Sequence, residues 1–533
     1  MMISYGQRHM EKSVEGNINN LPVHEYNLTI DQEKVTKAEG KEVMGMTING
    51  GIPGPTLEFT EGEYAVIYVE NKMDVETSIH WHGMLLPNFY DGVPYLSTPP
   101  IEPGKTLKYE FAIKQNGTYW YHSHTMLQEQ SGVFGPIVIQ PKEKTLEYDK
   151  EQVLVLSDWT NEKPRDVMRF LKRGTEWYNI RKGTATPLNQ VIARGALGAQ
   201  VDFWRQRMES ADIADIYYPA FLINGEENVE YPEFKPGEKV RLRIIDGSAS
   251  TSFWMAFGGP DPLLVSADGK DVVPVKRNKT FIAVAETYDF IVTIPENGKL
   301  EFKIMAQDGS GTATAYLGQG PIVAAPDVSR PDKIGMMQQM AKMKMKMGAP
   351  ALKFRPGKDE RYEMKEKWGM QMEGMKDMDM GTMNMDKSNM KGMEMKKHKM
   401  DEMQMDMKKD SMQMDHSKMA GMDTKKDSEM KEASQLKDMN KTNPTAGREV
   451  MDEADGMQGM DMFSQYNYDY LKSAEKTSYD PDVPVTEILL NLTGNMQRYI
   501  WSMNGVPLSE ADKIKIKGDE VTRITFNNLT MMH

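Results

Sequence analysis

The sequence predicts an all-β protein built from consecutive β-sandwich domains, together with one long segment that belongs to none of them. Three observations predict this. A strand, turn and strand pattern occurs three times, two short predicted strands carry paired histidines, and the stretch 331–462 loses all strand patterning and is rich in methionine. We therefore expect two complete sandwiches, an incomplete third and a long disordered insert.

Each copy of the repeat starts with an Asn-Gly pair. A second glycine follows, and after it comes a predicted strand whose residues are apolar or alternate between apolar and polar. The glycine-to-glycine spacings are 12, 12 and 13 residues. Alternation buries one face of a strand, as in sandwiches made of many short strands. The three copies begin at Asn49-Gly50, Asn224-Gly225 and Asn504-Gly505 and reach Gly62, Gly237 and Gly518. The expected organisation is a tail over 1–20, domains over 21–145 and 146–330, the insert over 331–462, and the start of a third domain over 463–533.

The composition excludes several classes of function and of metal site. The formal net charge is -13, which argues against nucleic acid as a partner, and no apolar run reaches the length of a membrane span. Residues 1–20 contain no apolar signal core, so either the protein is cytoplasmic or an export signal lies upstream. The absence of cysteine excludes disulfides, iron-sulfur sites and any copper centre that needs a thiolate.

Two His-x-His pairs stand 42 residues apart, His80-Trp81-His82 and His122-Ser123-His124. Residues i and i+2 of a strand share a face, so two such pairs on adjacent strands aim four ring nitrogens into one space. This arrangement suits a cluster of ions better than a single ion. Imidazole binds copper, zinc, iron and nickel alike, so a zinc site or structural histidines stay open as alternatives.

The histidine strand lies at a fixed offset in the repeat. His80 follows Gly62 by 18 residues, and the same offset in the second copy reaches Met255, which predicts a second domain that is a scaffold without metal. In the third copy the offset points beyond His533, the last residue. Asp91, in Asp91-Gly92, is by default a turn residue, although a place beside the cluster would let it relay protons. His9 and His24 are expected on the surface.

The insert contains 31 of the 47 methionines. It has too few branched apolar residues to build a core, so we expect disorder without metal. The thioether of methionine selects Cu(I), whereas the alternative is a linker in which methionine is merely tolerated. His398 is expected to be solvated. The candidate Cu(I) ligands are Met403, Met405, Met407, Met414, His416, Met419 and Met422.

Several motifs resemble those of multicopper oxidases of the bacterial copper-resistance type. In the first domain these are Pro53-Gly54-Pro55-Thr56, His80-Trp81-His82-Gly83, Asp91-Gly92-Val93-Pro94 and Tyr121-His122-Ser123-His124. Leu156-Ser157-Asp158-Trp159 and the stretches 236–243 and 283–289 resemble the second domain, and Met414-Asp415-His416-Ser417-Lys418-Met419 resembles the family's methionine-rich repeat.

The resemblance implies three cupredoxin-like Greek-key domains in a periplasmic protein that is monomeric when complete. A substrate, often Cu(I) or a phenol, would lose electrons to a mononuclear copper, and a trinuclear copper cluster would reduce dioxygen to water. His80 would bind the lone copper of that cluster, His82, His122 and His124 would bind its coupled pair, and Asp91 matches the residue that assists proton delivery.

The sequence departs from the family at its end, because the His-rich strand and the later His-Cys-His segment are missing. The resemblance leaves two readings of His533, which would be either the first of these ligands or, where the family reads Met-Met-x-His-Pro, one residue short of it. We therefore expect a C-terminally truncated oxidase that is inactive alone. A copper-binding or storage protein that uses the methionine segment is the alternative, and a two-domain copper nitrite reductase is a weaker one.

Overall fold

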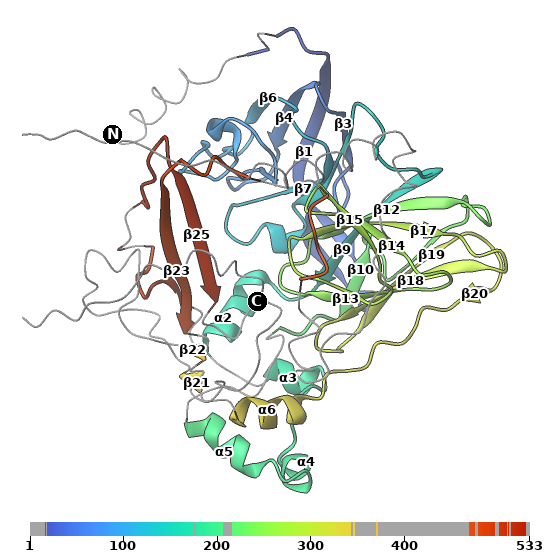
Figure 1. Ribbon diagram of the computed structural model, residues 1–533, viewed down its shortest axis with the longest axis vertical. Helices are drawn as coiled ribbons and strands as arrows, with labels where there is room; N and C mark the ends of the chain where they lie inside the picture. The colour runs from blue at the N-terminus through green and yellow to red at the C-terminus, as the bar shows by residue number, and fades with distance from the viewer. Residues whose placement is uncertain are drawn as a thin grey trace, which may run out of the picture. The chain divides into compact units, whose positions relative to one another are not determined.

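The computed structural model describes residues 16–17, 19–173, 177–205, 216–342, 345–346, 369–370, 468–474, 478–495, 500–508, 510 and 513–528. Strands dominate these residues and form separate sheets, of which the larger ones pair into sandwiches (Figure 1). The predicted all-β class with tandem β-sandwiches is confirmed.

The first sandwich consists of two four-stranded sheets, in the orders β2-β1-β4-β6 and β3-β8-β7-β5. Side chains from both sheets share one core, in which Trp81, Tyr109 and Tyr121 are among the largest buried residues. The strands are β1 (Val23–Thr36), β2 (Glu42–Ile48), β3 (Leu57–Thr60), β4 (Tyr64–Asn71), β5 (His80–His82), β6 (Thr106–Ala112), β7 (Gly117–His122) and β8 (Phe134–Gln140), with short 3-10 helices η1 (Asn88–Tyr90) and η2 (Glu129–Ser131).

The second sandwich is larger, with the sheets β10-β9-β12-β17-β14-β15 and β11-β19-β18-β13-β16, and β20 pairs with β18. The Phe257 ring lies between Phe290 and Phe302 in its core, at centroid distances of 4.9 and 5.0 Å. The strands are β9 (Lys150–Trp159), β10 (Ala220–Ile223), β11 (Asn228–Tyr231), β12 (Lys239–Asp246), β13 (Phe253–Phe257), β14 (Leu263–Ala267), β15 (Lys270–Lys276), β16 (Thr280–Ile282), β17 (Thr287–Thr293), β18 (Lys299–Ala306), β19 (Thr312–Leu317) and β20 (Ile322–Val323).

A helical insertion separates β9 from β10, which the sequence patterns above do not predict. Its first helix begins at Pro164, where the missing N–H costs no hydrogen bond, and it carries Asp166 in its first turn and Lys172 in its last, as the helix dipole favours. The helices are α2 (Pro164–Arg173), α3 (Trp177–Arg181), α4 (Leu188–Ala193) and α5 (Leu197–Arg205). Among the described residues, no helix combines the length and apolarity needed to span a bilayer.

The beginning of the predicted insert is also helical. Helix α6 (Lys333–Lys342) lies beside α5 in Figure 1, and Ile334 and Met337 pack with Val191 and Ala196 in a small core. The spacing of three residues places Ile334 and Met337 on one helix face, so this part of the methionine-rich stretch contributes to a core. Further on, the structure describes a two-residue pairing of β21 (Met345–Lys346) with β22 (Gly369–Met370).

The third copy of the repeat forms a three-stranded sheet, β24-β23-β25, from β23 (Val485–Asn495), β24 (Ile500–Met503) and β25 (Val521–Asn528). The first strand pairs antiparallel with the second and parallel with the third. The same arrangement holds for β1, β2 and β4 and for β9, β10 and β12. The threefold repeat read from the sequence is therefore a repeat of topology.

The Asn-Gly turns of the three copies have the same contacts. Asn49, Asn224 and Asn504 all have a positive φ, between 50° and 53°. Each side-chain oxygen accepts a backbone N–H of the first strand, from Thr29, Val155 and Asn491 respectively. Each side-chain N–H₂ donates to the carbonyl two residues earlier in that strand. The asparagine thus fixes the turn to the first strand in every copy.

Residues 468–474, which the sequence pattern assigns to the start of the third domain, lie against the second sandwich. Ser473 forms a β-bridge with Val272 of the edge strand β15, and the Tyr470 ring lies 4.2 Å from the Arg277 guanidinium. Tyr470 and Leu471 also pack against the core of the second sandwich. A strand edge with unpaired backbone groups recruits such a segment readily.

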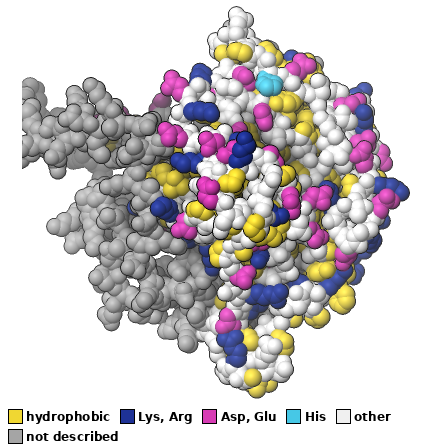
Figure 2. Space-filling view, turned by 90° about the vertical axis from the view of Figure 1, so that its right-hand side faces the viewer, with side chains coloured by type: hydrophobic (Ala, Val, Ile, Leu, Met, Phe, Trp, Pro, Cys, Tyr) yellow, Lys and Arg dark blue, Asp and Glu magenta, His cyan; other side chains and the backbone are white. Residues whose placement is uncertain are grey.

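Strand β7 of the first sandwich contacts the second sandwich. Trp120 from β7 packs with Trp159 and Ile245 of the second domain. Beside it, Thr118 donates its hydroxyl to Asp289, which also pairs with Arg241 and Arg243, all of them buried. In contrast to this buried charge network, Figure 2 shows acidic and basic side chains interspersed over the visible face. The second domain therefore braces the strand that carries His122.

Candidate metal centre

His80 and His82 lie on one strand and His122 on its neighbour, as the sequence predicts, whereas His124 follows two residues after that strand ends. Strands β5 and β7 pair antiparallel, with His80 opposite His122 and Trp81 opposite Tyr121. Trp81 and Tyr121 point into the core of the first sandwich, where each is at most 1% exposed. Because side chains alternate along a strand, the histidines are turned to the opposite face.

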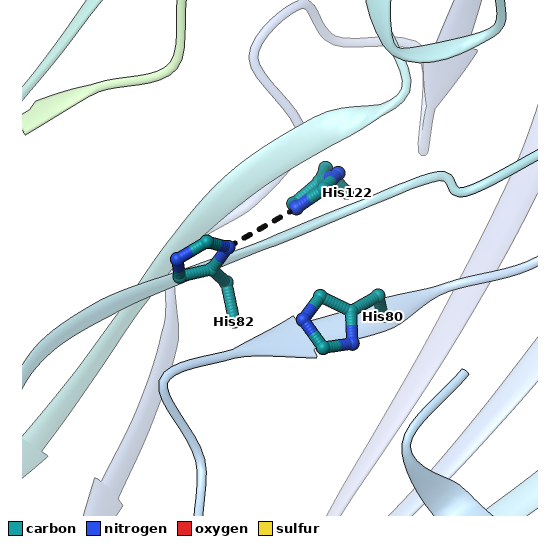
Figure 3. A group of neighbouring side chains, drawn as sticks. All are labelled: His80, His82 and His122. Carbon is teal, nitrogen blue, oxygen red and sulfur yellow. Dashed lines mark hydrogen bonds between the residues drawn. The ribbon is translucent and has the colours of Figure 1, made fainter. Parts of the chain in front are cut away.

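The imidazoles gather closely enough to share metal. One nitrogen from each of His80, His82 and His122 lies within 4.8 Å of the others, and Nδ1 of His82 is 3.3 Å from Nε2 of His122 (Figure 3). The His124 ring follows at 4.8 Å from that of His80 and 5.1 Å from that of His122. The structure thus brings together all four histidines that the sequence singled out.

Burial keeps three of these rings, those of His80, His82 and His124, in the uncharged form that binds metal. It lowers the pKa of His82 to about 4, with a further lowering by the neighbouring His122, His80 and His124. Burial is also the main reason why the pKa values of His80 and His124 are lowered. An uncharged imidazole presents a lone pair, so His80, His82 and His124 are ready ligands at neutral pH.

The position of Asp91 follows from a tight turn after η1. The Asp91 carbonyl accepts a hydrogen bond of 2.5 Å from Nδ1 of His80, and its carboxylate lies 3.7 Å from the same nitrogen. Gly92 has a φ of +88°, and a Cβ there would lie 1.8 Å from the Ile79 carbonyl oxygen, so glycine is required. The hydrogen on Nδ1 leaves Nε2 of His80 free for a metal. Asp91 is both the predicted turn residue and a neighbour of the cluster.

Two neighbours of the cluster gave no sequence signal. The Trp120 ring stacks on His122 at 4.1 Å and lies 5.2 Å from His82. The Glu129 carboxylate lies 3.3 Å from Nδ1 of His122. Trp120 was visible in the sequence only as one aromatic residue of an aromatic strand, and Glu129 reaches the cluster through a loop whose path no periodicity predicts.

The other candidate residues lie apart from this site or outside the described residues. His24 is partly exposed, stacks on Tyr26 at 4.9 Å and contacts Glu63. Met255 lies in the core of the second sandwich. Outside the described residues lie His9, His398, Met403, Met405, Met407, Met414, His416, Met419, Met422 and His533.

The donor set fits copper. It consists of imidazole nitrogens on two rigid strands, and imidazole suits copper, zinc, iron and nickel. Fold and site together define a class, that of tandem β-sandwich proteins that carry a cluster of imidazoles on paired strands of one domain. Within this class, models of the multicopper oxidase family match residues 29–144 and 150–324.

The chain belongs to the multicopper oxidase family. It is similar to Copper resistance protein A of Escherichia coli, with 37% identity over 532 residues that cover 95% of this chain and 81% of the relative. Copper resistance protein A of Pseudomonas syringae pv. tomato is 36% identical over 520 residues, with the same two coverages. Among solved structures, the multicopper oxidase Fet3p aligns with a TM-score of 0.46 at 23% identity, covering 62% of this chain and 60% of that chain. The family models and the two copper-resistance relatives confirm the predicted family.

Proposed function

We propose that this protein serves copper resistance as an oxidase that couples the one-electron oxidation of Cu(I) or phenols to the reduction of dioxygen to water. The observation that carries the proposal is the cross-strand pairing of His80 with His122, which gathers three imidazole nitrogens within 4.8 Å. The relatives named for copper resistance support the physiological role. Relatives named laccases support phenols as a substrate class.

The roles of the residues follow the family resemblance and the local contacts. His80 would hold the lone copper of a trinuclear cluster through Nε2, and His82, His122 and His124 would hold the coupled pair. When bound, the copper ions supply one-electron steps to dioxygen. The Asp91 carboxylate would carry protons between solvent and the site, a role supported by its 37% exposure and its distance of 3.7 Å from Nδ1 of His80.

Copper capture is assigned to the methionine-rich stretch. Met403, Met405, Met407, Met414, His416, Met419 and Met422 would offer thioether and imidazole ligands to Cu(I). A periplasmic place and a monomeric state follow from the family resemblance. The printed sequence has no cysteine, so we expect this chain alone to bind copper without turnover. The same observation favours, as the second candidate, a copper-binding or storage protein.

Copper titration of the metal-free protein tests the proposal. Cu(II) bound at the cluster should quench the fluorescence of Trp120, which stacks on His122. In the wild type we expect quenching at low copper concentration, which reports tight binding. His122→Ala should bind copper with much lower affinity. Trp120→Phe should still bind copper, but with much weaker quenching. Wild-type affinity in His122→Ala would contradict the proposed site.

Deletion of residues 343–462 tests the copper capture assigned to this stretch, and it leaves α6 in place because Met337 belongs to a core. A storage protein should lose its Cu(I) binding with a stable remaining fold. An oxidase should keep the Cu(II) site of the first domain. If the 533-residue chain alone consumes oxygen in the presence of a phenol, the expected lack of turnover is contradicted.

A further inference from the structure

The histidine that lies opposite His80 has two oxygen atoms at one of its ring nitrogens. Nδ1 of His122 is 3.3 Å from Oε2 of Glu129 and 3.2 Å from the carbonyl oxygen of Ser123. Carboxylate and carbonyl oxygens only accept hydrogen bonds. The nitrogen that faces both of them therefore carries the hydrogen.

The opposite ring nitrogen faces the other ligands. Nε2 of His122 is 3.3 Å from Nδ1 of His82. A neutral imidazole with its hydrogen on Nδ1 has its lone pair on Nε2. The contacts of Nδ1 therefore decide which nitrogen of His122 is turned toward the space that His80 and His82 share (Figure 3).

We infer that Glu129 is a positioning residue of the copper site: beside the Ser123 carbonyl, which accepts from Nδ1–H of His122, its carboxylate keeps the hydrogen on Nδ1 and so presents Nε2 of that ring to the metal. This inference rests on the proposed function, because it assigns a task toward bound copper. Carboxylates that accept the second N–H of a metal-binding histidine fix its ring and raise its basicity. The family motifs quoted above do not include Glu129.

The loop around Glu129 is held by the preceding residue. The buried Gln128 side chain accepts hydrogen bonds from Thr77 and Ser123 and donates one to the Glu76 carbonyl. This network ties the segment before β5 to the segment after β7. Gln128 thus supplies the structural contacts, and the Glu129 carboxylate, 22% exposed, serves His122.

A second glutamate of the same domain provides a matched control. The Glu110 side chain is 24% exposed, close to the value for Glu129, but its carboxylate pairs with Lys108 at 2.7 Å. Replacing either glutamate by glutamine removes the same charge from the first domain. A difference between the two variants therefore reports the contact with His122 and not the loss of a negative charge.

The first measurement is the tautomer of His122 in the metal-free wild type, from long-range ¹H–¹⁵N correlation spectra of ¹⁵N-labelled protein. We expect the hydrogen on Nδ1. Hydrogen on Nε2 alone would overturn the inference, and this result needs neither copper nor a variant.

The second measurement is the affinity for Cu(II) of folded variants. Loss of an outer partner of a metal-binding histidine costs roughly 10- to 100-fold in affinity, so we expect about that loss in Glu129→Ala. Glu129→Gln should lose less, because its amide oxygen still accepts, and Glu110→Gln should bind as the wild type does. If folded Glu129→Ala binds Cu(II) with wild-type affinity, the inference is overturned and the proposed function stands. A wild type that binds no copper overturns the proposed function as well.

Discussion

The first and second domains use the same strand pair for opposite purposes. In the first domain His80 lies opposite His122, and in the second Met255 lies opposite Ile304. His80 and Met255 both follow the second glycine of their repeat by 18 residues. Yet the histidines face away from their core, whereas Met255 and Ile304 are fully buried in theirs.

The distance of a residue from the second glycine of its repeat therefore does not determine which face of the strand is turned inward. In the first domain the neighbours of the histidines, Trp81 and Tyr121, fill the core. Since side chains alternate, a change by one residue exchanges the two faces of a strand. A metal site on a sandwich therefore needs ligands on the face that the core does not use.

The largest expected effect comes from the network that joins the two domains. Asp289→Ala leaves Arg241 and Arg243 buried without their shared carboxylate, and such a loss costs roughly 3–5 kcal/mol of the free energy of unfolding. Denaturant unfolding measures this. Because Thr118 on β7 loses its acceptor as well, copper affinity should also fall in the folded fraction. Unchanged stability would show that the second domain does not brace β7.

His82→Phe gives the first domain the residue that the second has at the same offset, Phe257. We expect copper affinity to fall more than about 100-fold, beyond the effect of losing an outer partner. The free energy of unfolding should stay the same or rise, because a half-buried imidazole is replaced by an apolar ring. Copper titration and thermal unfolding of one preparation measure both, and retained affinity would count against His82 as a ligand.

Met255→His makes the reverse exchange. The ring nitrogens would enter the core of the second sandwich, where Phe257 and Ile304 offer them no hydrogen bond, which costs about 1–3 kcal/mol beyond the lost packing. We expect a lower melting temperature and no additional copper bound. Gain of a copper site in this variant would show that sequence offset alone suffices.

The smallest expected effect concerns a position that follows the second glycine by nine residues in both domains. Asn71 donates from Nδ2 to the Val75 and Ile101 carbonyls, whereas Oδ2 of the matching Asp246 is buried without a described partner. Asp246→Asn replaces a buried carboxyl, whose ionisation burial opposes, by an amide that stays uncharged, and it should stabilise the protein by about 1 kcal/mol.

This gain should depend on pH. Burial raises the pKa of Asp246 well above its usual value, so the folded state keeps a proton that the unfolded state releases. The stability of the wild type relative to Asp246→Asn therefore decreases as pH rises above about 4. Denaturation of both proteins at pH 5 and pH 8 checks this, and an equal gap at the two values would contradict a proton held on Asp246.

The sequence predicted what short-range patterns encode. The Asn-Gly turns at 49, 224 and 504 and the two His-x-His pairs are local, and the structure places both as expected. The approach of Glu129 to His122 and the bridge of Ser473 to Val272 are long-range or loop contacts, which no spacing announces. The α2–α5 insertion interrupts the strand repeat, and in the sequence only Pro164 and the charges after it mark where it begins.

The asparagine turns also have a consequence for the chemical lifetime of the protein. Asparagine before glycine deamidates when the backbone nitrogen of the glycine attacks the side-chain carbonyl and ammonia is lost. Asparagine is accordingly a thermolabile residue. In the turns at Asn49, Asn224 and Asn504 both side-chain groups are bound to the neighbouring strand. The side chain must break these bonds before it can rotate into reach of the attacking nitrogen. The folded repeat thus slows the deamidation to which its own signature dipeptide is prone.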